Sequence, residues 1–355
     1  MLFYFSLFLF FVTLYNWAIR NNSKCLLLIA AIPPILLEGL RDENVGRDMM
    51  VYGAPWFYDM NTGYSLWDVI ENSSTPEYGY MYVIYFCKKI CPDIHLYMTV
   101  CATIKLLMVY FAAFKMRKAI HSTVFIFAYY CFFYVTTFSL MRQGIAVAIC
   151  IYSLTYFLEH KMKMFVVFII IAYFFHNSAV LMLLFFPIYY IRNMRFKYSI
   201  IILGIIFFYT SIEFLFPLLI NTSLFKSSMV ELYIDSGVPS AKTNILITII
   251  FVIYGGFLNI MKWKKYNERV FLLLTSSMIS LMFLFLASYI EVAFRMSYYT
   301  FFMSMLLTFF FVKQNRRLRE ISLITYMFLF LLHFYIECSH GLSDALKYSS
   351  KILNI

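Results

Sequence analysis

The sequence predicts an all-α, polytopic integral membrane protein with about 12 membrane segments, some of them short or re-entrant. Hydrophobic residues make up 63% of the 355 residues, enough for roughly 11 spans of ~20 residues each. Charged residues make up only 13%, about half the ~25% of a typical soluble domain. This composition excludes a soluble globular enzyme, a disordered chain and a nucleic-acid-binding domain, so the expected surroundings are a lipid bilayer and no nucleic acid is expected as a partner.

The expected segments are the uncharged apolar runs of the chain. They cover residues 2–19, 24–40, 94–113, 120–137, 139–158, 163–175, 177–191, 198–219, 244–261, 270–288, 294–312 and 321–338. The first run has no basic region and no small-residue cleavage site before it ends, so we expect a retained span and not a signal peptide. The runs around residue 176 are too short to cross alone, which predicts two short tilted helices or a re-entrant pair.

The basic residues orient these segments. One arrangement places 18 of the 29 Lys and Arg residues in turns on one side with only three acids, and leaves ten basic residues and fourteen acids on the other. Because short cytoplasmic loops are rich in Lys and Arg, both termini are then expected outside, with long outer loops over residues 41–93 and 220–243. Residues 78–90 must lie in the outer interface, since Lys88 and Lys89 would otherwise break the pattern. If that helix crosses, the topology before it inverts.

Few charged residues remain at membrane depth, where such groups are costly and usually functional or paired. Arg41, Arg142, His176 and Arg295 share one depth on the outer face in this topology. Arginine suits phosphate because its planar fork donates several hydrogen bonds and stays charged when partly desolvated. A histidine nearby can act as a base near neutral pH. Together these residues predict a site for a lipid-linked phosphate or diphosphate.

Each of these residues also has a purely structural interpretation. Arg142 could extend to the interface while its stem stays in the apolar layer, and Arg41 could anchor a helix end. Arg295 follows Glu291 by four residues, the spacing of a helical ion pair. His176 could be a turn residue capped by its neighbours. Lys105 and Glu213, inside other spans, are expected to be structural partners of opposite charges.

Other catalytic signatures are missing from the sequence. It has no Gly-rich loop followed by Lys-Ser/Thr, so ATP binding of the usual kind is not expected. It has neither His-Glu-x-x-His nor a paired Asp motif, so we expect no metal site and no cofactor. A substrate already activated as a lipid diphosphate needs neither.

At these residues the sequence resembles the EpsG family of Wzy-type polysaccharide polymerases. Five elements occur in the family's order over about 260 residues. They are Arg41 with Gly46, Asp48 and Tyr52; Glu77 with Tyr78, Gly79 and Tyr80; the Arg-Gln-x-x-Ala helix start at Arg142; the Phe-His-x-Ser-Ala turn at 175–179; and Arg295 with Tyr298 and Tyr299. One departure is Arg47, where a small polar residue is more usual.

The resemblance implies an activity. Such proteins join repeat units carried on undecaprenyl diphosphate at the outer face of a bacterial plasma membrane, alongside a flippase and a chain-length regulator, and a GT-C-like architecture is one form that their fold could take. Our hypothesis is that Arg142 and Arg295, with Arg41, hold the diphosphate and that His176 activates or orients the acceptor hydroxyl. The secondary candidates are acids as alternative base or sugar ligands, tyrosines that could contact sugars, and the amide beside the histidine: Asp48, Glu77, Glu291, Tyr52, Tyr78, Tyr233, Tyr298, Tyr299 and Asn177.

Three rival functions remain. A related ligase would move finished glycan from the same lipid carrier to another acceptor. A flippase of lipid-linked oligosaccharide would show related halves and a charged central cavity, and the sequence shows neither a repeat nor a mid-membrane charge array. A membrane acyltransferase would also use a buried histidine, but the ordered Arg motifs fit it less well.

Overall fold

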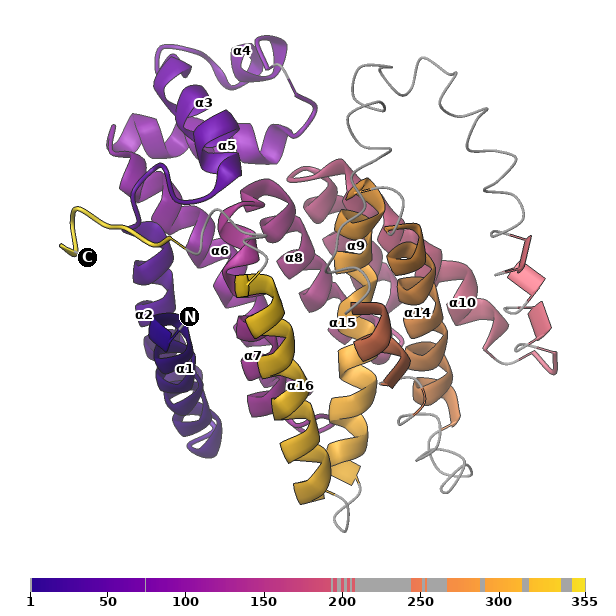
Figure 1. Cartoon of the computed structure of the whole chain (residues 1–355). Coiled ribbons are helices and arrows are strands. Elements are labelled where there is room, and N and C mark those ends of the chain that lie inside the picture. The colour runs from indigo at the N-terminus through magenta and orange to yellow at the C-terminus, as the bar shows by residue number, and fades with distance from the viewer. Residues whose placement is uncertain are drawn as a thin grey trace. The chain divides into compact units, whose positions relative to one another are not determined.

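The computed structural model is helical throughout its described regular structure, which confirms the all-α prediction (Figure 1). The structure describes residues 2–73, 75–192, 194–196, 199–200, 203–204, 206–207, 244–250, 253, 267–287, 291–314, 319–339 and 347–354. Two compact units can be distinguished. Unit 1 comprises Met1–Val180 and Val312–Ile355, and unit 2 comprises Leu181–Phe311.

Unit 1 contains the longer N-terminal helices and the last helix. Its helices are α1 (Leu2–Arg20), α2 (Lys24–Gly39), α3 (Ala54–Asp59), α4 (Leu66–Glu71), α5 (Tyr78–Ile90), α6 (Ile94–Met116), α7 (Ser122–Tyr129), α8 (Met141–Leu158), α9 (Met162–Tyr173) and α16 (Arg319–Ser339). A π-helical turn at Tyr130–Tyr134 and a 3₁₀ turn at Thr136–Phe138 connect α7 to α8. Described helices of unit 2 are α10 (Phe185–Ile191), α14 (Asn267–Leu286) and most of α15 (Glu291–Gln314).

Local sequence accounts for several helix ends. Ser23 caps α2 by accepting a hydrogen bond from the Leu26 amide, and Asp93 caps α6 by accepting one from the His95 amide, because the first amides of a helix lack partners within it. Asn22 and His160 have positive φ in the turns after α1 and α8, the left-handed geometry that commonly follows a helix. These tight turns make α1 and α2, and α8 and α9, antiparallel neighbours.

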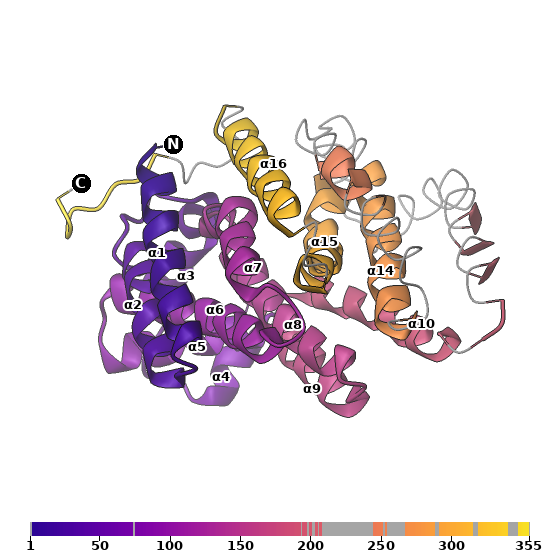
Figure 2. The same ribbon diagram turned by 90° about the horizontal axis from the view of Figure 1, so that it is seen from below.

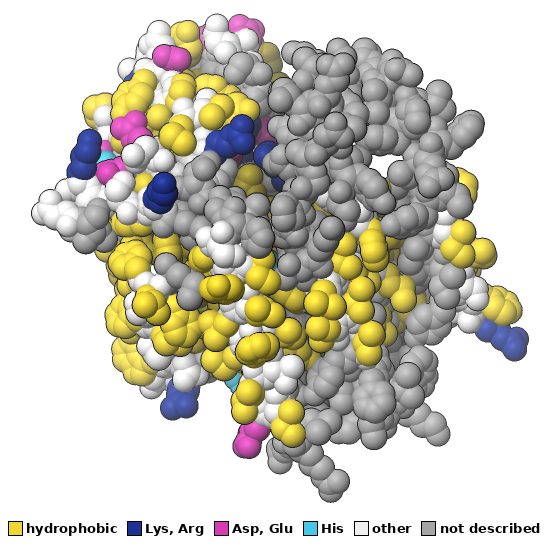
Figure 3. Space-filling model, viewed as in Figure 1, with side chains coloured by type: hydrophobic (Ala, Val, Ile, Leu, Met, Phe, Trp, Pro, Cys, Tyr) yellow, Lys and Arg dark blue, Asp and Glu magenta, His cyan; other side chains and the backbone are white. Residues whose placement is uncertain are grey.

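Helices α6 and α8 form the inside of unit 1. α6 packs against both α2 and α8, and α8 packs against α9. In the most apolar window of α8, 78% of residues are buried, against 28% for α1. The exposed side chains of α1 and α16 include Leu9, Phe10, Ile324 and Phe328, and Figure 3 shows hydrophobic side chains gathered on the visible face of unit 1. These helices therefore present an apolar surface suited to lipid.

Among the described residues, four helices are long and apolar enough to cross a membrane: α1, α6, α8 and α16. Four shorter apolar helices lie over Ser122–Tyr134, Met162–Tyr173, Asn177–Ile191 and Phe271–Leu286. The chain is thus an all-α membrane protein. The predicted segments 198–219 and 244–261 lie largely outside the described residues.

One end of unit 1 carries three short helices, and the other end carries basic residues. At one end, α3, α4 and α5 form a small helical layer beside the ends of α2 and α6, seen from two sides in Figures 1 and 2. At the other end, Arg117 donates to Asn22 at 2.6 Å, and Lys115 pairs with Glu159 at 3.4 Å. Three of the six basic turns that the sequence assigns to one side, those near residues 20–24, 115–118 and 159–163, therefore meet at one end of unit 1.

Candidate functional site

Three polar side chains from separate segments meet at the end of unit 1 that carries α3, α4 and α5. Glu77 directly precedes α5, Arg142 is the second residue of α8, and His176 lies in the turn after α9. We call Glu77, Arg142 and His176 the polar cluster. It joins three of the five sequence elements that were compared above, although the first and last of the three residues lie 99 positions apart.

The strongest contact in the polar cluster is an ion pair. Nη1 of Arg142 donates to Oε2 of Glu77 at 2.6 Å, and the two side chains are 15% and 7% exposed. The guanidinium lies 4.2 Å from the ring centroid of Tyr52 and 5.1 Å from that of Trp56, where cation–π attraction stabilises its charge. Nε of Arg142 is buried and has no hydrogen-bond partner among the described residues. Arg142 is therefore held by a carboxylate and two rings, with donor capacity to spare.

His176 lies on the other side of the same carboxylate. Its Nε2 is 3.8 Å from Oε1 of Glu77, longer than a hydrogen bond. Its Nδ1 is 2.7 Å from Oγ of Ser178 and accepts a hydrogen bond from the Ser178 amide at 3.3 Å. The side chain is 28% exposed. Since Nδ1 accepts a hydrogen bond, the neutral ring carries its hydrogen on Nε2, which faces Glu77.

The environment of Glu77 raises the pKa of its carboxyl group. Burial is the largest cause, and the nearby charge of Asp48 acts in the same direction. Arg142 and the backbone N–H of Asn177 oppose this by stabilising the carboxylate. Glu77 thus takes up a proton more readily than an exposed glutamate does, which is the usual way to prepare a carboxylate for proton transfer near neutral pH.

Two glycines allow the segments around the polar cluster to approach each other. The Gly79 amide donates to the Phe174 carbonyl at 2.9 Å, and a Cβ added to Gly79 would stand 3.0 Å from that oxygen. Gly46 has φ of +102°, and a Cβ there would stand 2.3 Å from the Phe138 carbonyl oxygen. Because only glycine adopts such a φ without strain and leaves this space free, the motif glycines fix where Glu77 and Asp48 lie.

Arg41 lies in a separate, fully buried cluster. Lys105 donates to Glu38 and to Thr137, both at 2.5 Å, and Nη1 of Arg41 lies 3.7 Å from the same Glu38 oxygen. Arg41 also donates to the carbonyls of Glu38, Val45 and Phe138, and its exposed fraction is 0%. All three of its nitrogens therefore bind protein oxygens, and Lys105 has the acidic partner expected of it.

The structure places the remaining candidates as follows. Asp48 and Asn177 act on Glu77, and Tyr52 contacts Arg142. Tyr78 begins α5 and is half-buried. Arg295 is half-buried on α15 of unit 2, one turn after Glu291, together with Tyr298 and the buried Tyr299. Tyr233 and Glu213 lie outside the described residues. Within the described ranges, no three His, Cys, Asp or Glu side chains form a group that could hold a metal ion.

Sequence reasoning overlooked three contributors. Glu38 was detectable, because an acid near the end of an apolar run needs a cationic partner. Ser178 was noted only as a cap for the turn, yet its Oγ lies against His176. Trp56 gave no signal, since its contact with Arg142 depends on how residues 49–59 fold back toward α8.

This arrangement can perform two chemical tasks. Arg142 can neutralise an anion, and its unpartnered Nε and the nearby rings offer a partly dry setting in which that charge acts strongly. Glu77 and His176 can accept a proton. Such a site suits two substrates, one that carries an anionic group and one that carries a hydroxyl.

One of three comparisons with known proteins found a match. The model of the EpsG family matches residues 24–350. No significant match was found among curated proteins or among solved structures. The matched range contains every candidate residue of unit 1 and unit 2.

Proposed function

Because this chain belongs to the EpsG family, we propose that it is a polysaccharide polymerase of the O-antigen or exopolysaccharide type. It joins repeat units carried on undecaprenyl diphosphate at the outer face of a bacterial plasma membrane. The observation that carries the proposal is the polar cluster, which combines a diphosphate-binding cation with two proton acceptors in three of the family's sequence elements.

The reaction is a glycosyl transfer without a nucleotide. The bond between the anomeric carbon of the growing glycan and its diphosphate oxygen breaks, and the lipid diphosphate leaves with the electron pair. The acceptor hydroxyl of a new lipid-linked unit forms the glycosidic bond and gives up its proton. The site must therefore stabilise a developing negative charge and remove one proton, with no metal or cofactor required.

The contacts suggest an order of events. An incoming diphosphate first meets the spare donors of Arg142 and then competes with Glu77 for its charge, because both are anions. When Arg142 turns to the diphosphate, Glu77 loses its main stabilising charge and its proton affinity rises. Glu77 and His176 then receive the proton from the acceptor hydroxyl. Binding of the leaving group would in this way prepare the base.

The other candidates take supporting roles in the proposal. Tyr52, Tyr78 and Asn177 contact the sugar or the diphosphate beside the polar cluster, and Asp48 is an alternative sugar ligand. Arg295 supplies a second cation to the diphosphate, with Glu291, Tyr298, Tyr299 and Tyr233 as further substrate contacts. Arg41 acts through its buried cluster, since its donors already bind protein oxygens.

The proposal also includes the membrane topology and the partner proteins expected from the sequence. The chain would cross the inner membrane in about 12 segments with a GT-C-like architecture and both termini outside. Residues 78–90 would lie in the outer interface. A flippase would supply the lipid-linked units, and a chain-length regulator would act on the product.

The experiment is complementation of a deletion strain with Glu77→Gln, Arg142→Ala or His176→Ala, with Lys88→Gln as the matched control. Lys88 is a charged side chain on α5 outside the polar cluster, and its ammonium donates to the Tyr58 carbonyl and lies 5.7 Å from the Phe57 ring centroid. We expect single-repeat product from the three site variants and a normal polysaccharide ladder from the control, at equal protein levels in the membrane fraction. A normal ladder from a site variant removes that residue from the mechanism. Free lipid-linked polymer in the deletion strain would instead indicate a ligase.

A further inference from the structure

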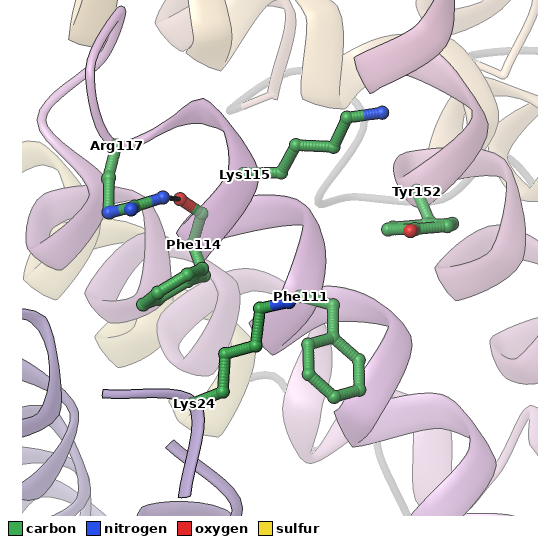
Figure 4. Close-up of a pocket in the computed structure, with 6 residues that line it drawn as sticks. All are labelled: Lys24, Phe111, Phe114, Lys115, Arg117 and Tyr152. Atoms are coloured by element: carbon green, nitrogen blue, oxygen red, sulfur yellow. Dashed lines mark hydrogen bonds between the residues drawn. The ribbon is translucent and has the colours of Figure 1, made fainter. Parts of the chain in front are cut away.

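A pocket at the basic end of unit 1 is unused by the proposed reaction. Its volume is about 550 Å³. It is lined by Lys24, Phe111, Phe114, Lys115, Arg117 and Tyr152 (Figure 4). Arg142 and Tyr152 are ten residues apart on α8, which corresponds to roughly 15 Å along a helix. The pocket is therefore remote from the polar cluster and requires its own explanation.

The pocket carries a net positive charge. Lys24 is exposed, and within the described part of the chain it makes no ion pair. The ammonium of Lys115 contacts Glu159 at 3.4 Å and lies 3.2 Å from the Tyr156 ring centroid, yet it has no hydrogen-bond partner among the described residues. Glu159 also pairs with Lys161 at 2.9 Å, so one acid is shared between two cations. The exposed Lys24 can thus offer donors to an anion, and the buried ammonium of Lys115 adds positive charge beside it.

Arg117 has a different part in the pocket. Its Nε and Nη2 donate to Asn22, and its Nη1 donates to the Phe114 carbonyl at 2.7 Å. The guanidinium also stacks 3.8 Å from the Phe114 ring centroid. Arg117 therefore fixes the wall of the pocket and adds charge at longer range. Lys24 extends toward Phe111, and Lys115 extends on the side of Tyr152 (Figure 4).

An apolar stripe begins at the pocket. Leu28 and Ile32 follow Lys24 by four and eight residues on α2, so they lie on the same side of the helix, and they are 44% and 49% exposed. A ligand with a phosphate in the pocket and an acyl chain along this stripe would satisfy both surfaces. Basic pockets between helices at a membrane surface suit anionic lipid head groups for this reason.

We propose that this pocket binds the phosphate of an anionic membrane lipid, held by Lys24 and Lys115 with its acyl chain along Leu28 and Ile32. The site would anchor the ends of α2, α6 and α8, the three helices that pack together inside unit 1. This inference does not depend on the glycosyl transfer, because it concerns the opposite ends of α6 and α8.

The test is native mass spectrometry of the purified full-length protein, delipidated and then titrated with phosphatidylglycerol or phosphatidylcholine. We expect preferential retention of phosphatidylglycerol. We expect about thirtyfold weaker retention by the double variant Lys24→Gln/Lys115→Gln, since each lysine near a lipid phosphate contributes about 1 kcal/mol. Lys163→Gln is the matched control, an exposed lysine of α9 outside the pocket. The double variant Lys24→Arg/Lys115→Arg should restore retention.

Three results would overturn the proposal. One is equal retention of both lipids by the wild-type protein, which decides the matter even if the double Gln variant fails to fold. Another is an equal loss of retention in Lys163→Gln, which would indicate general surface charge. The third is a rise in thermal stability with inorganic phosphate alone and no further rise with phosphatidylglycerol, which would assign the pocket to a soluble phosphate.

Discussion

The Lys105 ammonium lies 2.5 Å from the Glu38 carboxylate, and both side chains are 1% exposed. Arg41 lies 3.7 Å from the same carboxylate oxygen, so one buried acid is shared by two buried cations. The three charges are consequently unequal in importance. Removal of the acid leaves two like charges in an apolar interior, whereas removal of Lys105 leaves Glu38 with Arg41.

This asymmetry predicts the order of two substitutions. Glu38→Gln should lower the free energy of unfolding by about 3–5 kcal/mol, the cost of leaving a buried charge without its partner, and Lys105→Met should cost less. Adding Lys105→Met to Glu38→Gln should recover part of the loss, because it removes one of the two opposed cations. Thermal unfolding of the purified variants in detergent measures all three. Strict additivity of the two changes would contradict this account of the cluster.

Activity should depend on pH through Glu77. Burial raises the pKa of this carboxyl and Arg142 lowers it, so replacing Arg142 by Gln should raise the pKa further. If the carboxylate form is the active one, the acidic limb of the pH–rate profile then moves to higher pH in the residual activity of Arg142→Gln, measured with the purified variant. The rate of polymerisation of lipid-linked units across pH 5–8 gives this profile. An unmoved limb, with Lys88→Gln as the control for general charge loss, would show that Glu77 does not set it.

The hydrogen bond between Ser178 and His176 should matter through orientation. Ser178→Ala removes a contact of 2.7 Å to Nδ1, and the loss of one such bond is worth about 1 kcal/mol. We expect kcat to fall by about fivefold with KM little changed, and Ser178→Thr to retain the rate because it keeps the hydroxyl. Equal kcat for the Ala and Thr variants would exclude a positioning role.

Glycine substitutions should separate constrained positions from unconstrained ones. Gly46→Ala combines a φ of +102° with an overlap at the Phe138 carbonyl, which predicts a loss of at least about 1–3 kcal/mol. Gly204→Ala is the control, since no atom of the described residues lies within 4 Å of a Cβ added there. It should leave the unfolding midpoint unchanged or slightly raised. The two midpoints in one detergent provide the comparison, and similar values would refute the structural role of Gly46.

Two exposed cysteines can test the proposed topology. Cys25 begins α2 at the basic end of unit 1, and Cys91 follows α5 at the other end. In single-cysteine variants, a membrane-impermeant maleimide should label Cys91 in intact spheroplasts and Cys25 only after permeabilisation. Labelling of both from one side would show that α5, or another segment between them, crosses differently from the proposal.

The helices of unit 1 follow closely from apolar periodicity and charge. The predicted run 2–19 is α1 over Leu2–Arg20, and the predicted 13-residue helix 78–90 is α5 over Tyr78–Ile90. Hydropathy sufficed here because a long uncharged run has few alternatives to a helix in a membrane. The run 120–137 was less predictable, since it divides into α7 and two irregular turns that only tertiary packing determines.

The sequence predicted which chain segments reach the site, but it did not predict in which direction each side chain points. Arg142 and His176 were expected at one depth, and both lie in the polar cluster. Arg41 was expected there for the same reason, but its side chain points into the buried cluster with Glu38. Sequence spacing gives the height of a residue along a helix, whereas the direction of its side chain depends on neighbours 60 or more residues away. Arg295 belongs to unit 2, and its part in the site remains a prediction.

The contact between Trp56 and Arg142 provides an optical probe of the site. The chain has four tryptophans, and Trp56 is the one whose ring lies 5.1 Å from the Arg142 guanidinium. Replacing the other three by phenylalanine would leave Trp56 as the single indole emitter. Since indole fluorescence responds to nearby charge, its emission would report when the guanidinium changes partners, and substrate engagement could be followed in real time without a label on the lipid or the sugar.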